Sequence, residues 1–142
     1  MDATPRPLIL TLFSIYFACA GFATLVAGAA AWHFAGGIPW LEFIYAGMNG
    51  LFSYAFYTRE KWLLPTLTLN FIGYTCLYLA AWWAYSNVGL PSFLVSTLLA
   101  GGALAAVYAY RHTLRAAHRM YVGYAFLTLW ILAFTYTASL VL

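Results

Sequence analysis

The chain consists of long apolar segments separated by short polar breaks. Five of these segments are about 20 residues long, which is what an α-helix needs to cross roughly 30 Å of hydrocarbon. They lie near residues 8–32, 39–57, 62–85, 90–110 and 120–142. The pattern predicts an all-α, single-domain, polytopic membrane protein, built as a bundle of five transmembrane helices.

Composition indicates that lipid is the solvent. Hydrophobic residues make up 65% of the 142 positions and charged residues only 6%, whereas a soluble domain carries about 25% charged residues. A water-soluble bundle would need a polar face on every helix, and these segments lack one. The same scarcity of charge argues against a nucleic-acid partner, which requires a clustered basic surface on a water-exposed domain.

Basic residues predict the orientation of the bundle. One precedes the first segment, two lie between segments two and three, and three lie between segments four and five: Arg6; Arg59 and Lys61; and Arg111, Arg115 and Arg119. If all five segments cross, these residues share one side, which the positive-inside rule makes cytoplasmic. The second segment is the least apolar, but the pattern breaks without it. We therefore expect a cytoplasmic N-terminus, in a bacterial inner membrane or, as the alternative, an organellar membrane.

Tryptophans agree with this orientation. Trp32, Trp40, Trp82 and Trp83 fall near the boundary opposite the basic residues. Amphipathic rings favour such a boundary, where one edge of the ring meets water and the rest meets lipid.

An offset of 52 residues aligns several positions of similar type. It matches Pro39 with Pro91, Gly50 with Gly102, and Arg59 with Arg111. This suggests a duplicated helical hairpin, in which segments two and three correspond to segments four and five. Membrane physics alone also favours proline and arginine at helix ends, so the duplication is a hypothesis.

Small residues at four-residue spacing predict where helices approach closely. One such stripe is Ala23, Ala27 and Ala31, and another is Gly101, Ala105 and Ala109. Packing is the expected role of both stripes, and a groove for a lipid or pigment is the alternative.

A polar stripe on the second segment is the most informative feature for function. Glu42, Tyr45, Asn49 and Ser53 share one helical face, which should turn away from lipid. Asn70 lies at the same expected depth on the third segment, so we predict a direct contact between Asn49 and Asn70. Glu42 either reaches back to the interface, forms a proton or cation site, or meets another subunit.

Two further groups of polar residues lie near the predicted boundaries. His33 falls close to Glu42 at the predicted outer boundary; a surface histidine is the expected role, and a site where the two exchange protons is the alternative. On the cytoplasmic side a basic strip would form if the fourth helix continues past the membrane: Arg111, His112, Arg115, His118 and Arg119. Such a strip would rest on anionic lipid headgroups, bind a phosphate-bearing ligand or an acidic partner, or simply retain topology.

No residue pattern predicts a catalytic site, a metal site or a cofactor. Cys19 and Cys76 lie inside apolar runs without metal-ligand spacing. We expect a non-catalytic membrane protein, either an accessory subunit of a membrane complex or a binder of a hydrophobic, lipid-like molecule. A small oligomeric transporter or channel is the alternative, and a lipid-modifying enzyme is less favoured. The expected partners are membrane lipid and other membrane subunits or further copies of the chain.

Overall fold

A computed structural model describes residues 7–35, 38–85, 90–115 and 120–141, and its regular elements are all helical. In chain order these elements are α1 (Leu8–Ala35), α2 (Trp40–Thr58), α3 (Leu63–Tyr85), α4 (Leu90–Ala109), the 3₁₀ turn η1 (Arg111–Thr113) and α5 (Met120–Val141). The helices match the five predicted apolar segments to within a few residues at each end. The predicted all-α fold is therefore confirmed.

Three of the helices are long and apolar enough to cross a membrane. They cover Leu8–Phe34, Leu63–Trp83 and Met120–Ser139. In α4 the apolar stretch Phe93–Ala109 is shorter, and α2 has 19 residues that include Glu42 and Asn49. The structure thus indicates a membrane protein with three candidate spans, while the sequence-based count of five spans remains a prediction.

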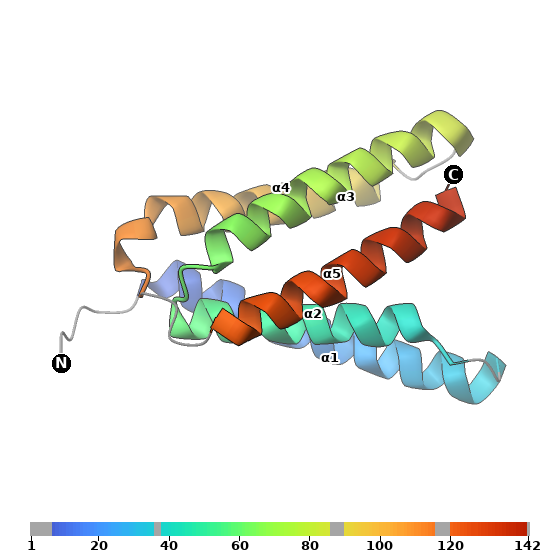
Figure 1. Ribbon diagram of the computed structural model, residues 1–142, viewed down its shortest axis with the longest axis horizontal. Coiled ribbons are helices and arrows are strands. Elements are labelled where there is room, and N and C mark those ends of the chain that lie inside the picture. Colours follow the sequence, from blue (N-terminus) through green and yellow to red (C-terminus); the bar gives the residue numbers. More distant parts are fainter. Residues whose placement is uncertain (1–6, 36–37, 86–89, 116–119, 142) are drawn as a thin grey trace.

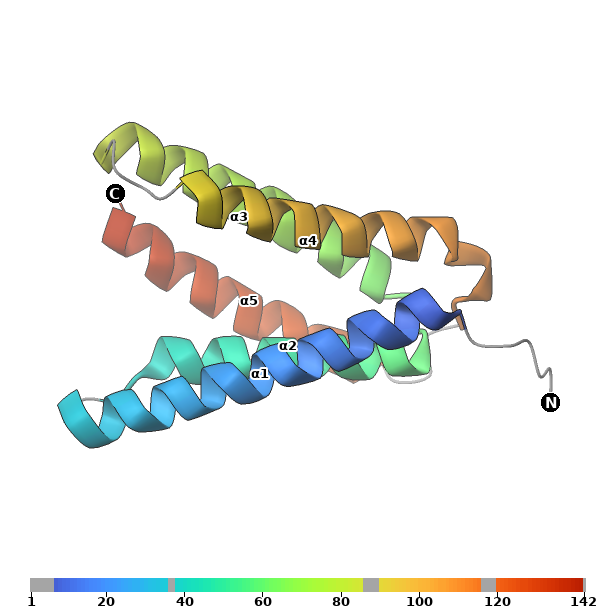
Figure 2. The same cartoon turned by 180° about the vertical axis from the view of Figure 1, so that it is seen from behind.

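The helices pack as two pairs with one helix between them (Figure 1). α1 lies along α2, α3 lies along α4, and α5 contacts both α2 and α3. The two pairs converge at the end where the chain begins and diverge toward the opposite end, as the reverse view also shows (Figure 2). The predicted hairpin of segments two and three is therefore not a closely packed pair, and the duplication remains a hypothesis.

Glycines explain why α1 pairs so closely with α2. A Cβ atom built on Gly21 would lie 3.2 Å from the carbonyl oxygen of Ala46, and one on Gly28 would lie 3.0 Å from Glu42 Cβ. Only a residue without a side chain lets the two backbones approach this far. Ser14, Gly21 and Gly28 repeat every seven residues along this interface, which is the period of a left-handed helix pair.

The small-residue stripes predicted from sequence do not form these contacts. Ala23 and Ala27 are exposed on α1, and Ala105 is exposed on α4. On α4 the buried residues are instead Ala103 and Val107, both with no exposed surface. Ala31 and Gly101 are half-buried, and a Cβ on Gly101 would lie 3.7 Å from the ring of Phe71 on α3. The closest contact of α1 with α2 nevertheless uses Gly21 and Gly28, because four-residue spacing alone does not show where a neighbouring helix lies.

The hydrophobic core lies at the convergent end. The largest side chains with no exposed surface come one from each helix: Leu10, Phe56, Leu63, Val107 and Phe126. Aromatic rings fill the space between them, with Phe52 4.4 Å from Phe126 between ring centroids. Each helix contributes its buried side chain near the end that adjoins the basic loops. This end is therefore the most fully packed part of the bundle.

Two loops are joined at the same end by backbone hydrogen bonds. Glu60 and Arg115 form a parallel bridge, in which the N–H of Arg115 donates to the carbonyl of Arg59 at 2.7 Å and the N–H of Lys61 donates to the carbonyl of Arg115 at 3.1 Å. Arg59 ends α2 in the left-handed conformation, with φ 59°. That turn is unfavourable for a residue other than glycine, but it directs the loop of α2 and α3 toward Arg115.

Candidate functional site

The polar stripe of α2 divides among three environments. Ser53 faces α1, Tyr45 and Asn49 line an internal cavity, and Glu42 packs beside Gly28. The stripe therefore turns toward protein at these positions. Ser53, Asn49 and Glu42 all lie against α1, beside Ser14, Gly21 and Gly28, whereas the hydroxyl of Tyr45 reaches Thr137 of α5.

Ser53 forms a reciprocal pair with Ser14 of α1. Ser14 Oγ donates to the carbonyl oxygen of Ser53 at 2.9 Å, and Ser53 Oγ donates to the carbonyl oxygen of Ser14 at 2.8 Å. Both hydroxyls are satisfied by the opposite backbone, so this pair stabilises the helix contact and has no free group for a ligand.

A cavity of about 480 Å³ lies between α1, α2, α3 and α4. Its size falls within the range of about 300 to 1,000 Å³ that small-molecule sites occupy. Aromatic, aliphatic, amide and hydroxyl side chains all contribute to the wall: Phe17, Thr24, Tyr45, Met48, Asn49, Phe52, Asn70, Tyr74, Ser96 and Ala100. The lining contains no carboxylate, ammonium, guanidinium or imidazole group.

Asn49 and Asn70 both line this cavity, as expected from their equal predicted depth. The predicted direct contact is not made by hydrogen bonding: among the described residues, no hydrogen bond joins the two amides or holds either of them. Counting residues from the turn gave the two amides the same expected depth, but the predicted contact also required α2 and α3 to pack together. Because α2 packs on α1 and α3 packs on α4, a cavity separates the two side chains.

Tyr45 connects the cavity to α5. Its hydroxyl lies 3.4 Å from Thr137 Oγ1, and Thr137 Oγ1 already donates to the carbonyl oxygen of Ala133 at 2.8 Å. Tyr45 therefore donates to Thr137, and its own oxygen can still accept a hydrogen bond. The sequence stripe included Tyr45 but gave no sign of Thr137, which is distant along the chain.

Comparison of the chain with protein-family models, curated proteins and solved structures finds no match.

His33 and Glu42 do not form a pair in the described part of the chain. His33 is exposed at the end of α1, with its ring 5.1 Å from that of Phe34 in an edge-on arrangement. No ion pair or hydrogen bond joins it to Glu42, which is half-buried against Gly28. Among the described residues no group of three potential metal ligands occurs. The shared proton-exchange site therefore gains no support.

The predicted basic strip is not a continuous helical face. α4 ends at Ala109, Arg111 and His112 lie in the 3₁₀ turn, and the extended residue Leu114 leads to Arg115. Arg111 lies 4.3 Å above the ring of Tyr108, whereas Arg115 is held beside the loop of α2 and α3. His118 and Arg119 lie outside the described residues. The expectation of one strip was wrong at Arg115, because the helix does not continue past the 3₁₀ turn.

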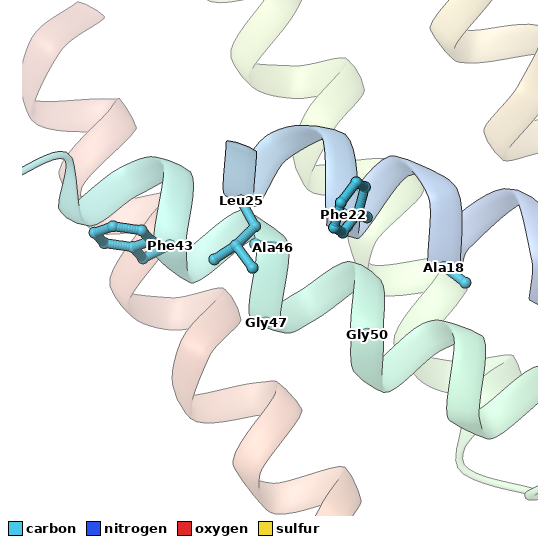
Figure 3. Close-up of a pocket in the computed structure, with 8 residues that line it drawn as sticks. Ala18, Phe22, Leu25, Phe43, Ala46, Gly47 and Gly50 are labelled. Carbon is cyan, nitrogen blue, oxygen red and sulfur yellow. The ribbon is translucent and has the colours of Figure 1, made fainter. Parts of the chain in front are cut away.

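Two apolar grooves accompany the cavity, and sequence reasoning missed both. One, of about 400 Å³, runs between α1 and α2 and is lined by Ala18, Gly21, Phe22, Leu25, Phe43, Ala46, Gly47 and Gly50 (Figure 3). The other, of about 380 Å³, lies between α3 and α5. Gly47 and Gly50 were a signal for the first groove, since both are exposed glycines that leave space on the surface of α2.

Proposed function

We propose that the chain is a five-span membrane protein that binds a hydrophobic molecule in the cavity between α1, α2, α3 and α4. The cytoplasmic side is the convergent end, with the N-terminus there. Support for this placement comes from four described basic residues in the loops at that end, Arg59, Lys61, Arg111 and Arg115, and from the exposed Trp32, Trp40, Trp82 and Trp83 at the other.

The placement is tested by labelling single cysteines in intact cells, in a chain with Cys19 and Cys76 replaced by alanine. An impermeant thiol reagent should label a cysteine in loop 86–89 and should not label Lys61→Cys, which lies in an exposed position at the basic end. Detergent-solubilised protein, in which both positions react, is the control. Labelling of both positions in cells would contradict the five-span topology.

Two amide side chains near the middle of their helices, both in the lining of one cavity, support the proposal of a ligand. Asn49 and Asn70 are half-buried, line the same space, and have no hydrogen bond within the described chain. An amide left without a partner away from water costs free energy of roughly 1 to 3 kcal/mol. A ligand that carries a hydroxyl or carbonyl group would satisfy both amides and fill the apolar remainder of the cavity.

The lining also limits the charge of the ligand. Its polar groups are amides and hydroxyls, and it contains no carboxylate, ammonium, guanidinium or imidazole group. A charged headgroup would lose its hydration there without an opposite charge to replace it. The ligand class is therefore a neutral, mostly apolar molecule with one or two hydrogen-bonding groups, such as a polyprenyl alcohol, a quinone or a diacylglycerol.

The experiment is native mass spectrometry of protein purified in mild detergent, followed by extraction and identification of the bound molecule. The wild-type protein should carry a neutral molecule in stoichiometric amount. Asn49→Leu and Asn70→Leu, which keep side-chain volume and remove the amides, should lose it. Thr68→Val is the matched control, because the hydroxyl of Thr68 bonds only to its own helix, at the carbonyl of Leu64, and lies outside the cavity. Retention of the molecule by both leucine variants would refute the cavity as its site.

A small transporter is the second candidate function. The observation in its favour is the asymmetry of the bundle, which is joined by backbone hydrogen bonds at the basic end and divergent at the other (Figure 1). A protein that gives access to a central site from one side has this form. Flux of the identified ligand between liposome leaflets, lost in Asn49→Leu, would favour transport over simple binding.

A further inference from the structure

The groove between α3 and α5 lies apart from the cavity and at the basic end of the bundle. It begins at Trp62 and Met120, next to the loops, and continues along both helices through Pro65, Thr66, Leu69, Gly123, Tyr124 and Leu127. Its only side-chain hydroxyl on α3, that of Thr66, is already bonded to the carbonyls of Trp62 and Leu63. The groove therefore offers an apolar surface about two turns long.

Gly123 shapes the head of this groove. A Cβ atom on Gly123 would lie 3.2 Å from Cγ of Trp62 and 3.4 Å from its Cβ. The absence of a side chain lets the indole ring lie directly against the backbone of α5. This contact closes the inner end of the groove with an aromatic wall, at the level where the loops begin.

Two basic residues are adjacent through their backbones beside that wall. Lys61 immediately precedes Trp62, and its N–H donates to the carbonyl of Arg115 at 3.1 Å. Both Lys61 and Arg115 are exposed, whereas the neighbouring Glu60 is only 4% exposed. The bridge thus brings together the backbones of two exposed basic residues, from loops more than 50 residues apart, next to Trp62 at one end of an apolar groove.

We infer that this place is a binding site for an anionic phospholipid, with the phosphate between Lys61 and Arg115 and an acyl chain in the groove of α3 and α5. Charge complementarity decides the class of occupant: two adjacent cations favour a negative headgroup, and the apolar groove that continues from them favours a hydrocarbon chain. The site rests on the membrane placement proposed above, but not on the ligand of the cavity.

Native mass spectrometry with added phosphatidylglycerol tests this site, with phosphatidylcholine as the neutral comparison. The wild-type protein should bind one phosphatidylglycerol more tightly than phosphatidylcholine. The double variant Lys61→Gln/Arg115→Gln should bind it about 30-fold more weakly, since each basic residue near a charged surface is worth about fivefold. Leu127→Trp, which fills the groove without changing the bridge, should also lose the lipid.

Arg111→Gln is the matched control, because Arg111 is exposed at the same end but stacks on Tyr108 of α4. It should change phosphatidylglycerol affinity by less than about twofold, as expected of a cation outside the headgroup contact. An equal loss in Arg111→Gln would mean that the lipid responds to the whole basic end, and no loss in the double variant would mean that Lys61 and Arg115 do not bind the headgroup. Either result would overturn the site. A dimer that Leu127→Trp dissociates would instead assign the groove to a second copy of the chain.

The two sites are distinguished by the cavity variants. Asn49→Leu should lose the neutral ligand and keep phosphatidylglycerol. Loss of phosphatidylglycerol in Asn49→Leu would place the lipid in the cavity and overturn the inference, whereas absence of a neutral ligand alone would contradict only the proposed function. Circular dichroism of each variant confirms that it is folded before its affinity is compared.

Discussion

Two neighbouring turns of the polar stripe of α2 differ in their surroundings. Toward α1, Gly21 and Gly28 allow close backbone contact, and Ser53 is satisfied by the backbone of Ser14. Asn49, one turn before Ser53, also lies beside Gly21 of α1, but it lines a cavity shared with Asn70. Polar residues on one face of α2 are thus satisfied by a neighbouring backbone at one turn and open to a cavity at the next. The distance to the neighbouring helix, more than the polar residue itself, decides which role it takes.

The largest expected effect comes from placing a larger side chain in the contact between α1 and α2. Gly21→Leu should destabilise the folded protein by about 1 to 3 kcal/mol, the usual cost of overpacking, because the added side chain meets the backbone of α2. Gly50→Leu is the matched substitution on the same helix pair. A Cβ there meets nothing within 4 Å, so its cost should stay within about 0.5 kcal/mol. Reversible unfolding in mixed detergent micelles measures both, and equal costs would remove the glycines as the reason for the pairing.

A smaller effect is expected from the serine pair. Ser14→Ala and Ser53→Ala should each lower the free energy of unfolding by about 0.5 to 2 kcal/mol, as for other hydrogen bonds between membrane helices. Since the two bonds depend on one approach of the backbones, the double variant should cost less than the sum of the single variants. Thr68→Val, whose hydroxyl bonds within its own helix, should change stability less than either serine variant. Strict additivity would show that the two bonds form independently.

The smallest effect is expected between Asn49 and Asn70, which line the same cavity. Because no hydrogen bond joins Asn49 to Asn70 in the described chain, Asn49→Ala and Asn70→Ala should be additive in the ligand-free protein, with a coupling energy below about 0.5 kcal/mol. Adding the bound molecule should make the pair non-additive, since one ligand then contacts both amides. Strong coupling without ligand would mean that the cavity closes and the amides meet directly.

Several features of this fold were predictable from local pattern. Helix bounds followed from apolar length. The equal depth of Asn49 and Asn70 followed from counting residues outward from the turn between Arg59 and Glu60. Each of these predictions depends on the rise and period of a single helix, which the sequence determines directly.

The candidate sites were predictable only in part. Asn49, Tyr45 and Asn70 were singled out as polar residues that avoid lipid, but Ser96 and Thr24 of the same cavity were not. Ser and Thr are common in membrane helices because they can bond to their own backbone, as Thr24 does to the carbonyl of Ala20 at 2.8 Å. Such residues give no signal until a neighbouring helix places them beside a cavity.

The sequence by itself determined that the chain forms five apolar helices and that its described basic residues gather in loops between them, because hydrophobicity and helical period are properties of one segment. Only the tertiary structure decided that α2 pairs with α1, that a cavity separates Asn49 from Asn70, and that Lys61 lies beside Arg115. These features depend on which helices approach each other and how closely. Which helices pair depends on the fit between two surfaces, such as Gly21 against Ala46. The sequence of one helix alone does not show that fit.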